Sequence, residues 1–594
     1  MSLHSSRQVV PDSDFLRSVP LFFGLTPTSL RELAARTAAV SVRAGEYLFH
    51  EGDPSDSMYV VGSGRLEVLM FEAGPLVARV LTRGAVVGEL GILTGTPRSA
   101  SVRARRDSEL MKITGNDFAG LLDDSPHFAA ELSRALGRAL QASRGVGSEI
   151  NPAPRTVAIL PMGRDVPVQA LSERLGHWLE TFGTVGVMRA GDSDPADESA
   201  IARQLDERER QNDRVLLVVG ATDPSSWRDF CARQADRVLL LVNETSQVER
   251  SPHPELRNCD LVRCAPPARI PIGAWLSALQ PRAVYNVDTI PARPAQQEPI
   301  AALARRLAGR SVGLVLSGGG ARGSAHIGVV DRLAAAGVLI DRVVGCSMGS
   351  LAAAAVATGM SPAEMADGWY RYMVASNPLS DYTFPAVALV RGAKLLEGLR
   401  EQFGSTRIED LPHEFFCVSS DIHAGQLHVH RYGPLVDAIY ASMAIPGLLP
   451  PATVDGCVLV DGGVLNNLPV DVLTSRGEGP VVAVNLTVQS SRKRPSAESD
   501  PGRARRLASV IQATVTGAKG SSPPLRETLM RALLLGSVDS TRAAREKADV
   551  LITPDTRGIG LLEFGALQRG IDAGRTATNE VLADPGNRER LLLD

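Results

Sequence analysis

The first part of the chain alternates short apolar runs with glycine turns. After a helical pattern at 30–39, the apolar runs YLFH, MYVVG and RLEVLM are punctuated by glycines at 45, 52, 62, 64, 74 and 84. Short strands at regular spacing, with turn signals between them, predict a small β-barrel or jelly roll. A helical pattern at 128–142 closes this block, which we place at residues 15–145, and GVGSEINPAP links it to the next.

The second block, residues 155–294, alternates strand and helix patterns. Its apolar strands are TVAILPM, TVGVMRA, RVLLVVG, RVLLLVN and CDLVRCA, with helical patterns at 168–182 and 227–235. That alternation predicts a parallel sheet with crossover helices. The first strand exits through PMGRDVP, which lacks the GxxxxGKS or GxxxxGKT pattern that wraps phosphates. The sequence therefore assigns this block a fold class and no chemistry.

The third block, residues 311–590, opens with the apolar strand VGLVLS and the run GGGARG and continues as an α/β pattern. The chain is thus predicted to be multidomain: an N-terminal β jelly roll with flanking helices, a middle α/β parallel-sheet domain and a C-terminal α/β domain. We find neither a signal peptide nor a run near the roughly 18 apolar residues of a spanning helix. We therefore expect a cytoplasmic protein.

Composition excludes several classes of protein. Among 594 residues, 63 are Lys or Arg and 66 are Asp or Glu, and the net charge of −3 gives no reason to expect a nucleic-acid partner. A hydrophobic share of 44% excludes a largely disordered chain. Six cysteines without a CxxC pair indicate neither a disulfide framework nor a zinc ribbon, and we expect no metal site.

The strongest chemical signal is GCSMG at 345–349, between a short strand-like run and the helical run SLAAAAVA. In a strand–turn–helix setting GxSxG is a nucleophile elbow, whose small residues let the backbone turn sharply and expose the serine hydroxyl. The following helix would place its positive N-terminal dipole near a developing oxyanion. Ser347 is therefore the candidate nucleophile.

A serine nucleophile needs a base, and a histidine triad is one alternative. In the order Ser, Asp, His it would use Asp421 with a histidine of the segment DIHAGQLHVHRYG, namely His423, His428 or His430. The alternating spacing of His428 and His430 is more typical of one face of a strand.

The rival base is Asp461, in the DGG turn that follows the strand CVLV. A carboxylate held beside the hydroxyl can accept its proton directly if burial keeps the carboxylate ordered. An ordinary Asp-Gly turn is the alternative explanation.

The glycine run GGGARG lies at 318–323, between a strand and a helix pattern. Consecutive glycines let backbone N–H groups converge on an anion. A dinucleotide-binding GxGxxG also fits the spacing, but such an oxidoreductase site lacks the acidic residue about 20 positions on and leaves the serine elbow unexplained. An oxyanion hole uses both features.

GGGARG, GCSMG and DGG, in this order, resemble the patatin-like phospholipase family. ASMAIPGLLPP at 441–451 and GGVLNNLPV at 462–470 support the resemblance, and the tail ADVLITPDTRGIGLLEFGALQRGIDAG looks like the neuropathy target esterase branch. The resemblance implies that the third block is a patatin-like hydrolase domain acting on lysophospholipids and phospholipids. It also implies a catalytic dyad of Ser347 and Asp461 that needs no metal or cofactor.

The same resemblance assigns the glycine run. It implies an oxyanion hole formed by the backbone amides of Gly318, Gly319 and Gly320, with Arg322 nearby.

A second constellation, GELGIL at 88–93 followed by PRSASV at 97–102, lies in the first block. A short helix from Glu89 would point backbone N–H groups at a phosphate, Arg98 could pair with the phosphate oxygens, and Glu89 could accept from a ribose 2′-hydroxyl. This resembles the phosphate-binding cassette of cyclic-nucleotide-binding domains. The resemblance implies contacts from Gly88, Glu89, Leu90, Arg98 and Ser99, and we favour cAMP over cGMP. A barrel kept only as a structural or dimerising module is the alternative.

These signals predict a serine esterase, a lysophospholipase or phospholipase, regulated by cyclic nucleotide. The alternative is a cyclic-nucleotide sensor whose hydrolase-like domain binds lipid without turnover. Because the substrate lies in membranes, we expect peripheral docking on the inner face, with 525–537 and 382–399 as candidate segments. The oligomeric state, a homo-oligomer included, stays open.

Overall fold

The computed structural model describes residues 13–17, 19–22, 26–71, 75–81, 83–124, 153–192, 198–248, 256, 259–266, 270–287, 298–384, 387–487 and 536–592. The predicted helix at 128–142 and nearly all of segment 525–537 lie outside these residues. The chain forms two compact units, Met1–Ala308 and Gly309–Asp594.

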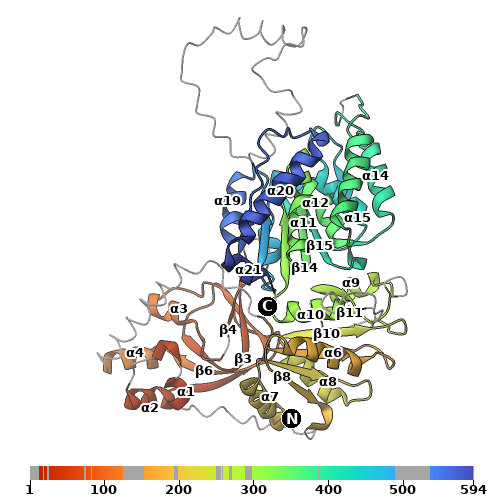
Figure 1. Ribbon diagram of the computed structural model, residues 1–594. Helices are drawn as coiled ribbons and strands as arrows, with labels where there is room; N and C mark the ends of the chain where they lie inside the picture. The colour runs from red at the N-terminus through yellow and green to blue at the C-terminus, as the bar shows by residue number, and fades with distance from the viewer. Residues whose placement is uncertain are drawn as a thin grey trace, which may run out of the picture. The chain divides into compact units, whose positions relative to one another are not determined.

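The first sheet of the N-terminal unit is antiparallel throughout and forms the predicted jelly roll (Figure 1). Its strands are β1 (Ala38–Val42), β2 (Tyr47–Phe49), β3 (Ser57–Phe71), β4 (Pro75–Leu81), β5 (Val86–Val87) and β6 (Ser101–Thr114), in the order β1-β6-β3-β4, with β2 on β6 and β5 on β3. The helical segments beside it are α1 (Ser13–Arg17), η1 (Pro20–Phe22), α2 (Pro27–Ala35), α3 (Glu89–Thr94) and α4 (Gly115–Asp124). Strand β6 alternates buried with half-buried residues along most of its length, as expected of a strand with one face on the core.

The helix predicted at 30–39 is shorter at its C-terminal end. Helix α2 begins after Thr26, whose hydroxyl accepts the N–H of Ser29, and it ends at Ala35. Residues 38 and 39 belong instead to β1, which pairs with β6. Pairing with a long neighbouring strand overrides the helical pattern there.

The second sheet of this unit is the predicted parallel sheet. Its strands are β7 (Thr156–Pro161), β8 (Val185–Arg189), β9 (Arg214–Val218), β10 (Arg237–Val242), β11 (Asp260–Arg263) and β12 (Ala283–Asn286), in the order β12-β11-β10-β7-β9-β8. The helical segments are α6 (Val168–Glu180), η2 (Ala190–Asp192), α7 (Glu198–Gln211), α8 (Ser225–Gln234), α9 (Gly273–Leu279) and α10 (Pro299–Leu307). Core clusters on the two faces place α6 and α10 on one side and α7, α8 and α9 on the other.

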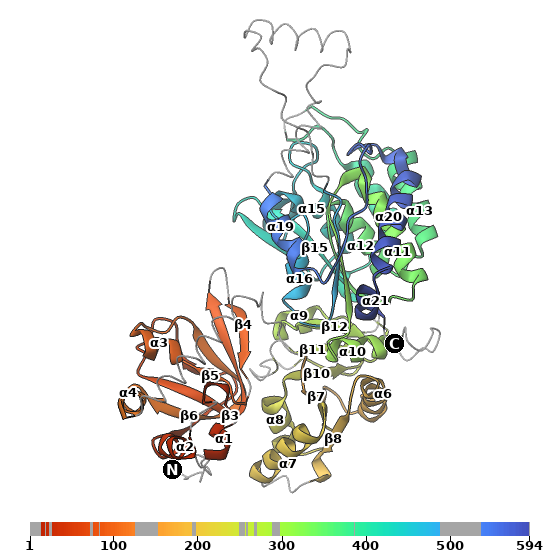
Figure 2. The ribbon, with the colours of Figure 1, turned by 60° about the vertical axis from the view of Figure 1, so that its left-hand side comes forward.

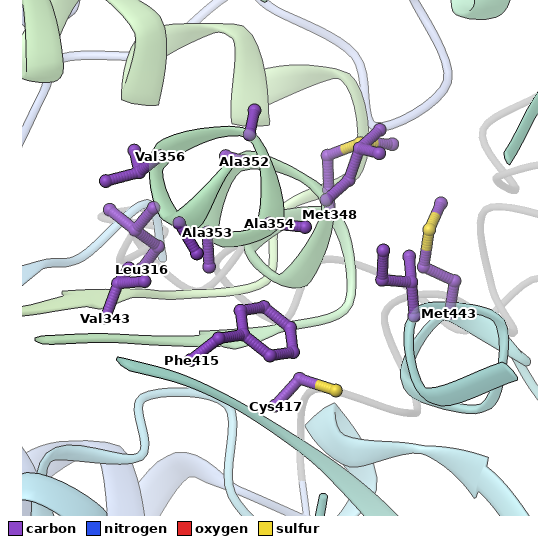
Figure 3. Packing of buried hydrophobic residues seen from close by; sticks show 14 of the residues in the cluster. Leu316, Val343, Met348, Ala352, Ala353, Ala354, Val356, Phe415, Cys417 and Met443 are labelled. Carbon is purple, nitrogen blue, oxygen red and sulfur yellow. The ribbon is translucent and has the colours of Figure 1, made fainter. Parts of the chain in front are cut away.

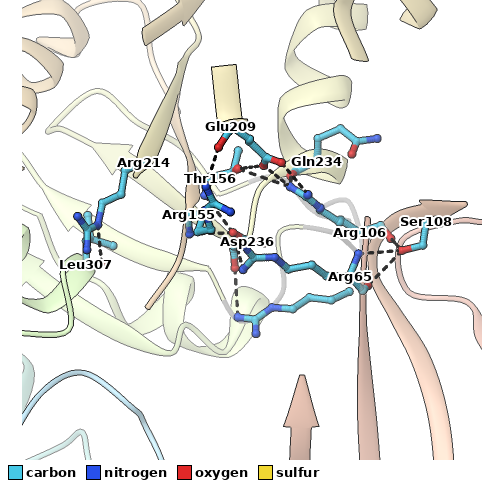
Figure 4. A network of polar contacts seen from close by, with 11 residues as sticks. Arg65, Arg106, Ser108, Arg155, Thr156, Glu209, Arg214, Gln234, Asp236 and Leu307 are labelled. Atoms are coloured by element: carbon cyan, nitrogen blue, oxygen red, sulfur yellow. Dashed lines mark hydrogen bonds and ion pairs between the residues drawn. The ribbon is translucent and has the colours of Figure 1, made fainter. Parts of the chain in front are cut away.

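A buried ion-pair network joins the jelly roll to this sheet (Figure 4). Arg65 of β3 contacts Asp236 at 2.7 Å, and Arg106 of β6 contacts Glu209 of α7 at 2.7 Å. Asp236 also accepts the N–H of Thr156 at 3.0 Å. Burial opposes ionisation of Asp236, but Arg65 and Arg106 outweigh it and hold its pKa below the ordinary value. Asp236 is therefore a buried charge whose partners come from both sheets.

The C-terminal unit holds an eight-stranded sheet with a parallel centre and an antiparallel edge (Figure 2). Its strands are β13 (Val312–Leu316), β14 (Ile340–Cys346), β15 (Glu414–Asp421), β16 (Gln426–His430), β17 (Ala452–Val454), β18 (Cys457–Asp461), β19 (Val481–Val484) and β20 (Val550–Ile552), in the order β17-β18-β15-β14-β13-β19-β20, with β16 on β15. The α-helices are α11 (Ser324–Ala335), α12 (Met348–Ala357), α13 (Pro362–Trp369), α14 (Ala393–Phe403), α15 (Leu435–Met443), α16 (Val470–Thr474), α19 (Val538–Lys547), α20 (Leu567–Leu582) and α21 (Pro585–Leu591). The other helical segments are η6 (Gly320–Gly323), the π-helix η7 (Tyr370–Ala375), η8 (Ile408–Asp410), η9 (Gly462–Val464) and η10 (Phe564–Ala566).

Helix α12 is the central buried helix of this unit, and every one of its residues is buried (Figure 3). Its alanines pack among Leu316, Val343 and Phe415 of three adjacent strands. Side chains this small let the helix approach the sheet closely, so the first turn of α12 is fixed over the ends of β13 and β14.

Across the described residues, no helix is both long and apolar enough to cross a membrane.

Candidate functional site

Ser347 lies at the sharp turn between β14 and α12. Its backbone has φ 53° and ψ −124°, a conformation that residues with a side chain rarely adopt. The two flanking glycines permit the turn, because a Cβ on Gly345 would overlap the carbonyl of Gly349, and a Cβ on Gly349 would overlap the carbonyl of Leu316. The sharp turn therefore requires glycine at both flanking positions, the second one because a neighbouring strand lies close to it.

The hydroxyl of Ser347 faces a buried carboxylate. Ser347 Oγ donates to Asp461 Oδ2 at 2.6 Å, and Asp461 Oδ1 accepts the N–H of Gly463 at 2.8 Å. Asp461 ends β18 and has no exposed surface. Burial raises its pKa to about 6, although both hydrogen bonds favour the ionised form. At pH 7 this carboxylate is mostly ionised, yet it binds a proton far more readily than an exposed aspartate.

The glycine run packs against Ser347. A Cβ on Gly318 would overlap Asn467 Oδ1 and would lie 3.1 Å from Ser347 Cβ, so the missing side chain lets this loop pack tightly against both residues. The N–H of Gly318 donates to the carbonyl of Asn467 at 3.3 Å. Within the described ranges we find no acceptor for the N–H of Gly319 or Gly320. The amide of Gly318 is thus already hydrogen-bonded within the protein, whereas those of Gly319 and Gly320 are available as donors to an oxyanion.

Arg322 links the glycine run to a distant part of the same unit. Its Nε donates to the carbonyl of Ile559 at 3.0 Å, which ties the glycine run to the segment before α20. This contact helps to fix the loop that carries the glycine run.

The histidine alternative is not assembled. His430 Nε2 lies 2.8 Å from Ser419 Oγ, and burial together with His428 lowers the pKa of His430 to about 3. The carboxylate of Asp421 accepts the backbone N–H of His423 at 2.8 Å within a turn. In the part of the chain that the structure describes, no histidine hydrogen-bonds to Ser347 or Asp461.

Two further residues of this site were missed from the sequence. Ser442, at the end of α15, accepts the N–H of Ser347 at 2.9 Å and donates to the carbonyl of Val418 at 2.7 Å. Asn467 donates through Nδ2 to the carbonyl of Gly318 at 3.3 Å and so joins the glycine run to the chain after the DGG turn. Both lie in the segments ASMAIPGLLPP and GGVLNNLPV, but no spacing rule singles them out.

The second site centres on Arg98, which is 5% exposed. Its Nη2 donates to the carbonyl of Ser57 at 2.7 Å and its Nη1 to the carbonyl of Gly88 at 3.2 Å, while its guanidinium lies 4.1 Å from the centroid of the Phe49 ring. Among the residues that the structure describes, its Nε has no hydrogen-bond partner. A buried guanidinium with an unused donor is suited to an anionic ligand.

The remaining cassette residues lie around the short helix α3. Gly88 has φ 83°, and a Cβ there would overlap Arg98 Nη1, so only glycine lets this arginine lie at the start of α3. Glu89, half-buried, is the first residue of α3, Leu90 follows it, and Ser99 is exposed just beyond Arg98. The structure thus brings Arg98 and the start of α3 together.

Comparisons with known proteins match the regions that contain the two sites. The patatin-like phospholipase model matches residues 314–474, and the cyclic nucleotide-binding domain model matches residues 39–125. The N-terminal domain of a transcriptional regulator from Streptomyces coelicolor A3(2) is a similar solved structure, 31% identical, covering 22% of this chain and 94% of that one, with a TM-score of 0.21.

Relatives match much longer parts of the chain. The lysophospholipase nte1 of Aspergillus fumigatus is 28% identical over 89% of this chain and 40% of its own length. Patatin-like phospholipase domain-containing protein 6 of Mus musculus is 30% identical over 76% of this chain and 38% of its own. An uncharacterized NTE family protein of Mycobacterium tuberculosis is 35% identical over 96% of both chains. With near full-length similarity to that relative, and with both family models matched, this chain belongs to the NTE family.

Proposed function

We propose that the chain is a serine esterase that hydrolyses acyl esters of lysophospholipids or phospholipids, with Ser347 as nucleophile and Asp461 as base. The observation that carries the proposal is the 2.6 Å hydrogen bond from Ser347 Oγ to a buried carboxylate of raised pKa. The fungal relative's name, a lysophospholipase, supports the substrate class. Release of fatty acid from lysophosphatidylcholine by the purified full chain tests the activity.

In the proposed reaction, Ser347 Oγ attacks the ester carbonyl carbon while its proton passes to Asp461 Oδ2. The N–H groups of Gly319 and Gly320 stabilise the tetrahedral oxyanion. Its collapse breaks the ester C–O bond, and Asp461 returns the proton to the leaving glycerol oxygen. Water then attacks the acyl-serine and gives a proton to Asp461. That proton returns to Ser347 as the fatty acid leaves.

The pH dependence of hydrolysis tests the role of Asp461. Because Asp461 must be ionised to accept the proton and its pKa is raised to about 6, we expect kcat/KM to fall about tenfold per pH unit below pH 6. An ordinary exposed aspartate would place this limb near pH 4. A profile measured from pH 4.5 to 8.5 that stays flat down to pH 4.5 would contradict a base whose pKa is raised to about 6.

We further propose that the N-terminal site binds a cyclic nucleotide, cAMP rather than cGMP, and that this ligand regulates hydrolysis. Support comes from the buried guanidinium of Arg98, its unused Nε and the adjacent start of α3. The phosphate of the ligand would pair with Arg98, and the carboxylate of Glu89 would accept from the ribose hydroxyl.

Replacing Arg98 with alanine is expected to weaken cAMP binding by about 10- to 100-fold, since a charge-assisted hydrogen-bonded contact contributes roughly 1.5–3 kcal/mol. Titration calorimetry on the full chain measures this, with exposed Arg43→Ala as the matched control. Equal affinities for the wild type and Arg98→Ala would contradict the site. Comparing hydrolysis rates with and without saturating cAMP tests the regulatory role separately.

We propose three domains: a cyclic-nucleotide-binding domain at 15–145, an α/β domain at 155–294 and a patatin-like phospholipase domain at 311–590.

We also propose a cytoplasmic location with peripheral contact to the membrane inner face. The docking surface would be the loop before α14, where Tyr382 is 67%, Phe384 86% and Val387 69% exposed. The helical part of the predicted docking segment lies on α14. It does not belong to the proposed docking surface, because its Leu395 and Leu399 are buried in the core.

Exchanging Phe384 and Val387 for serine together is expected to weaken binding to phosphatidylcholine vesicles by tenfold or more, because burying one such side chain contributes about 1.5–3 kcal/mol. Cosedimentation measures the binding, and hydrolysis of a soluble short-chain ester should be unchanged. Ile422→Ser, at a position 51% exposed on the turn between β15 and β16, is the control. Equal loss of binding in the control would contradict a specific docking loop.

A further inference from the structure

A cleft of about 400 Å³ opens beside the parallel sheet of the N-terminal unit, in the block to which the sequence assigned no chemistry. It lies at the carboxyl ends of β7, β9 and β10, and its lining includes Gly163, Arg164, Gly220, Asp223, Arg228 and Thr245. Sites for small organic ligands commonly have volumes of roughly 300–1,000 Å³, so the cleft is large enough for a ligand of that size.

The topology of the sheet explains why a cleft forms at this place. From central strand β7 the chain crosses to edge strand β8, then returns through β9 and passes β7 to reach β10. Helix α6, which follows β7, and helix α8, which precedes β10, cover opposite faces. The connections therefore diverge at β7 and β10, which makes this a topological switch point. Ligands of open α/β sheets bind at such points, outside the carboxyl ends of the strands.

Two arginines supply positive charge to the cleft. Arg164 is exposed in the loop after β7, and half-buried Arg228 lies on α8, where its Nη2 contacts Met162 Sδ at 3.0 Å. A thioether is only a weak acceptor. Among the residues that the structure describes, neither arginine pairs with a carboxylate. The guanidinium groups of Arg164 and Arg228 are thus available for an anion, and arginine pairs bidentately with phosphate.

The rest of the lining is held in place by its own hydrogen bonds. Asp223 is the acidic residue of the lining, and its Oδ2 accepts the N–H of Gly220 at 2.7 Å. In the loop after β10, Asn243 Oδ1 accepts from Thr245 Oγ1 at 2.9 Å and from Ser246 Oγ at 2.9 Å. Because these loops are internally bonded, the cleft is formed before any ligand arrives.

We propose that this cleft binds a small phosphate ester, with its phosphate on Arg164 and Arg228 and its organic part in the remaining volume. The site lacks the GxxxxGKS or GxxxxGKT loop that wraps phosphates, whose lysine carries a positive charge. Here Arg164 and Arg228 supply the positive charge instead. A nucleotide and a glycerophosphate headgroup share this chemistry, and the two probes below distinguish them.

The test is titration calorimetry of the full chain with AMP and, separately, with glycerol 3-phosphate. We expect at least one probe to bind at submillimolar concentration and to lose tenfold or more in affinity in both Arg164→Ala and Arg228→Ala. Binding of AMP alone assigns a nucleotide, and binding of glycerol 3-phosphate alone assigns a headgroup. Both results support the proposal.

The controls separate this cleft from other arginines and from misfolding. Affinity should be unchanged in Arg203→Ala, an exposed position on α7. The titrations are repeated with every variant made in the Arg98→Ala background, so that AMP bound at the cassette does not contribute. Because Arg164 is exposed, Arg164→Ala should not affect folding. If Arg228→Ala lowers the unfolding midpoint, Arg164→Ala alone still tests the site. Absence of binding by both probes at millimolar concentration, or binding retained in the Arg164→Ala/Arg228→Ala double variant, would overturn the proposal.

Discussion

Alanine in place of Ser347 is expected to lower the kcat for fatty acid release from lysophosphatidylcholine by about 10⁴-fold or more. The substitution removes the atom that attacks the ester, and loss of a serine nucleophile leaves only the small residual rate due to binding and oxyanion stabilisation. Substrate affinity should change little, because the hydroxyl of Ser347 is 2.6 Å from Asp461 and already bonded within the protein.

The control for this substitution is Ser376→Ala, at an exposed serine of the same unit whose hydroxyl donates to the carbonyl of Tyr372. It should retain full activity. Turnover by Ser347→Ala at a rate within tenfold of the wild type would contradict the mechanism. A wild-type chain that binds lysophospholipid without hydrolysing it would favour the sensor alternative instead.

Asparagine in place of Asp461 is expected to lower kcat by about 10³- to 10⁴-fold. Asparagine has nearly the same shape and can still hydrogen-bond to Ser347 Oγ, but its amide cannot take the proton. The loss should fall on kcat rather than KM, since the base acts in the transition state. Asp437→Asn, at an exposed position on α15, is the matched control and should be fully active.

Stability separates the chemical role of Asp461 from a structural one. Its folded-state pKa of about 6 lies above the unfolded value near 3.9, so ionising it on raising the pH through this range costs folding free energy. The unfolding free energy of Asp461→Asn at pH 8 should therefore be no lower than that of the wild type. An inactive variant that is also much less stable at pH 8 would point to a structural role.

The local features of the site could be predicted from the sequence, because each depends on residues a few positions apart. GCSMG predicts the turn, since a Cβ on Gly345 would overlap the carbonyl of Gly349, four positions on. The cassette is similar, because Gly88 and Arg98 lie ten positions apart and in contact.

Contacts between segments that lie far apart in the sequence could be identified only from the family resemblance or from the structure. No spacing rule links Ser347 to Asp461, which is 114 positions later, and the resemblance supplied that pairing. It did not indicate that Arg322 bonds to Ile559 or that Ser442 holds the N–H of Ser347. Such contacts follow from how β13, β14, β15 and α15 pack, which no single segment encodes.

Weakly patterned elements were missed for a different reason. Strand β12 has only four residues, and α7, with the sequence ESAIARQLDERERQ, has few apolar positions. A strand of four residues is too short to show a period, and the core-facing side of α7 is marked mainly by Ile201 and Leu205. The cleft was missed as well, because it depends on strand order and on arginines from two separate segments.

The most direct test of the Ser347–Asp461 mechanism is covalent labelling with a fluorophosphonate, followed by mass spectrometry of the proteolytic peptides. We predict one added phosphonyl group, on the peptide that contains Ser347, in proportion to the activity lost. We predict no label at that peptide in Ser347→Ala and much slower labelling in Asp461→Asn. Full loss of activity with Ser347 unlabelled, or with the label on a different residue, would contradict the account.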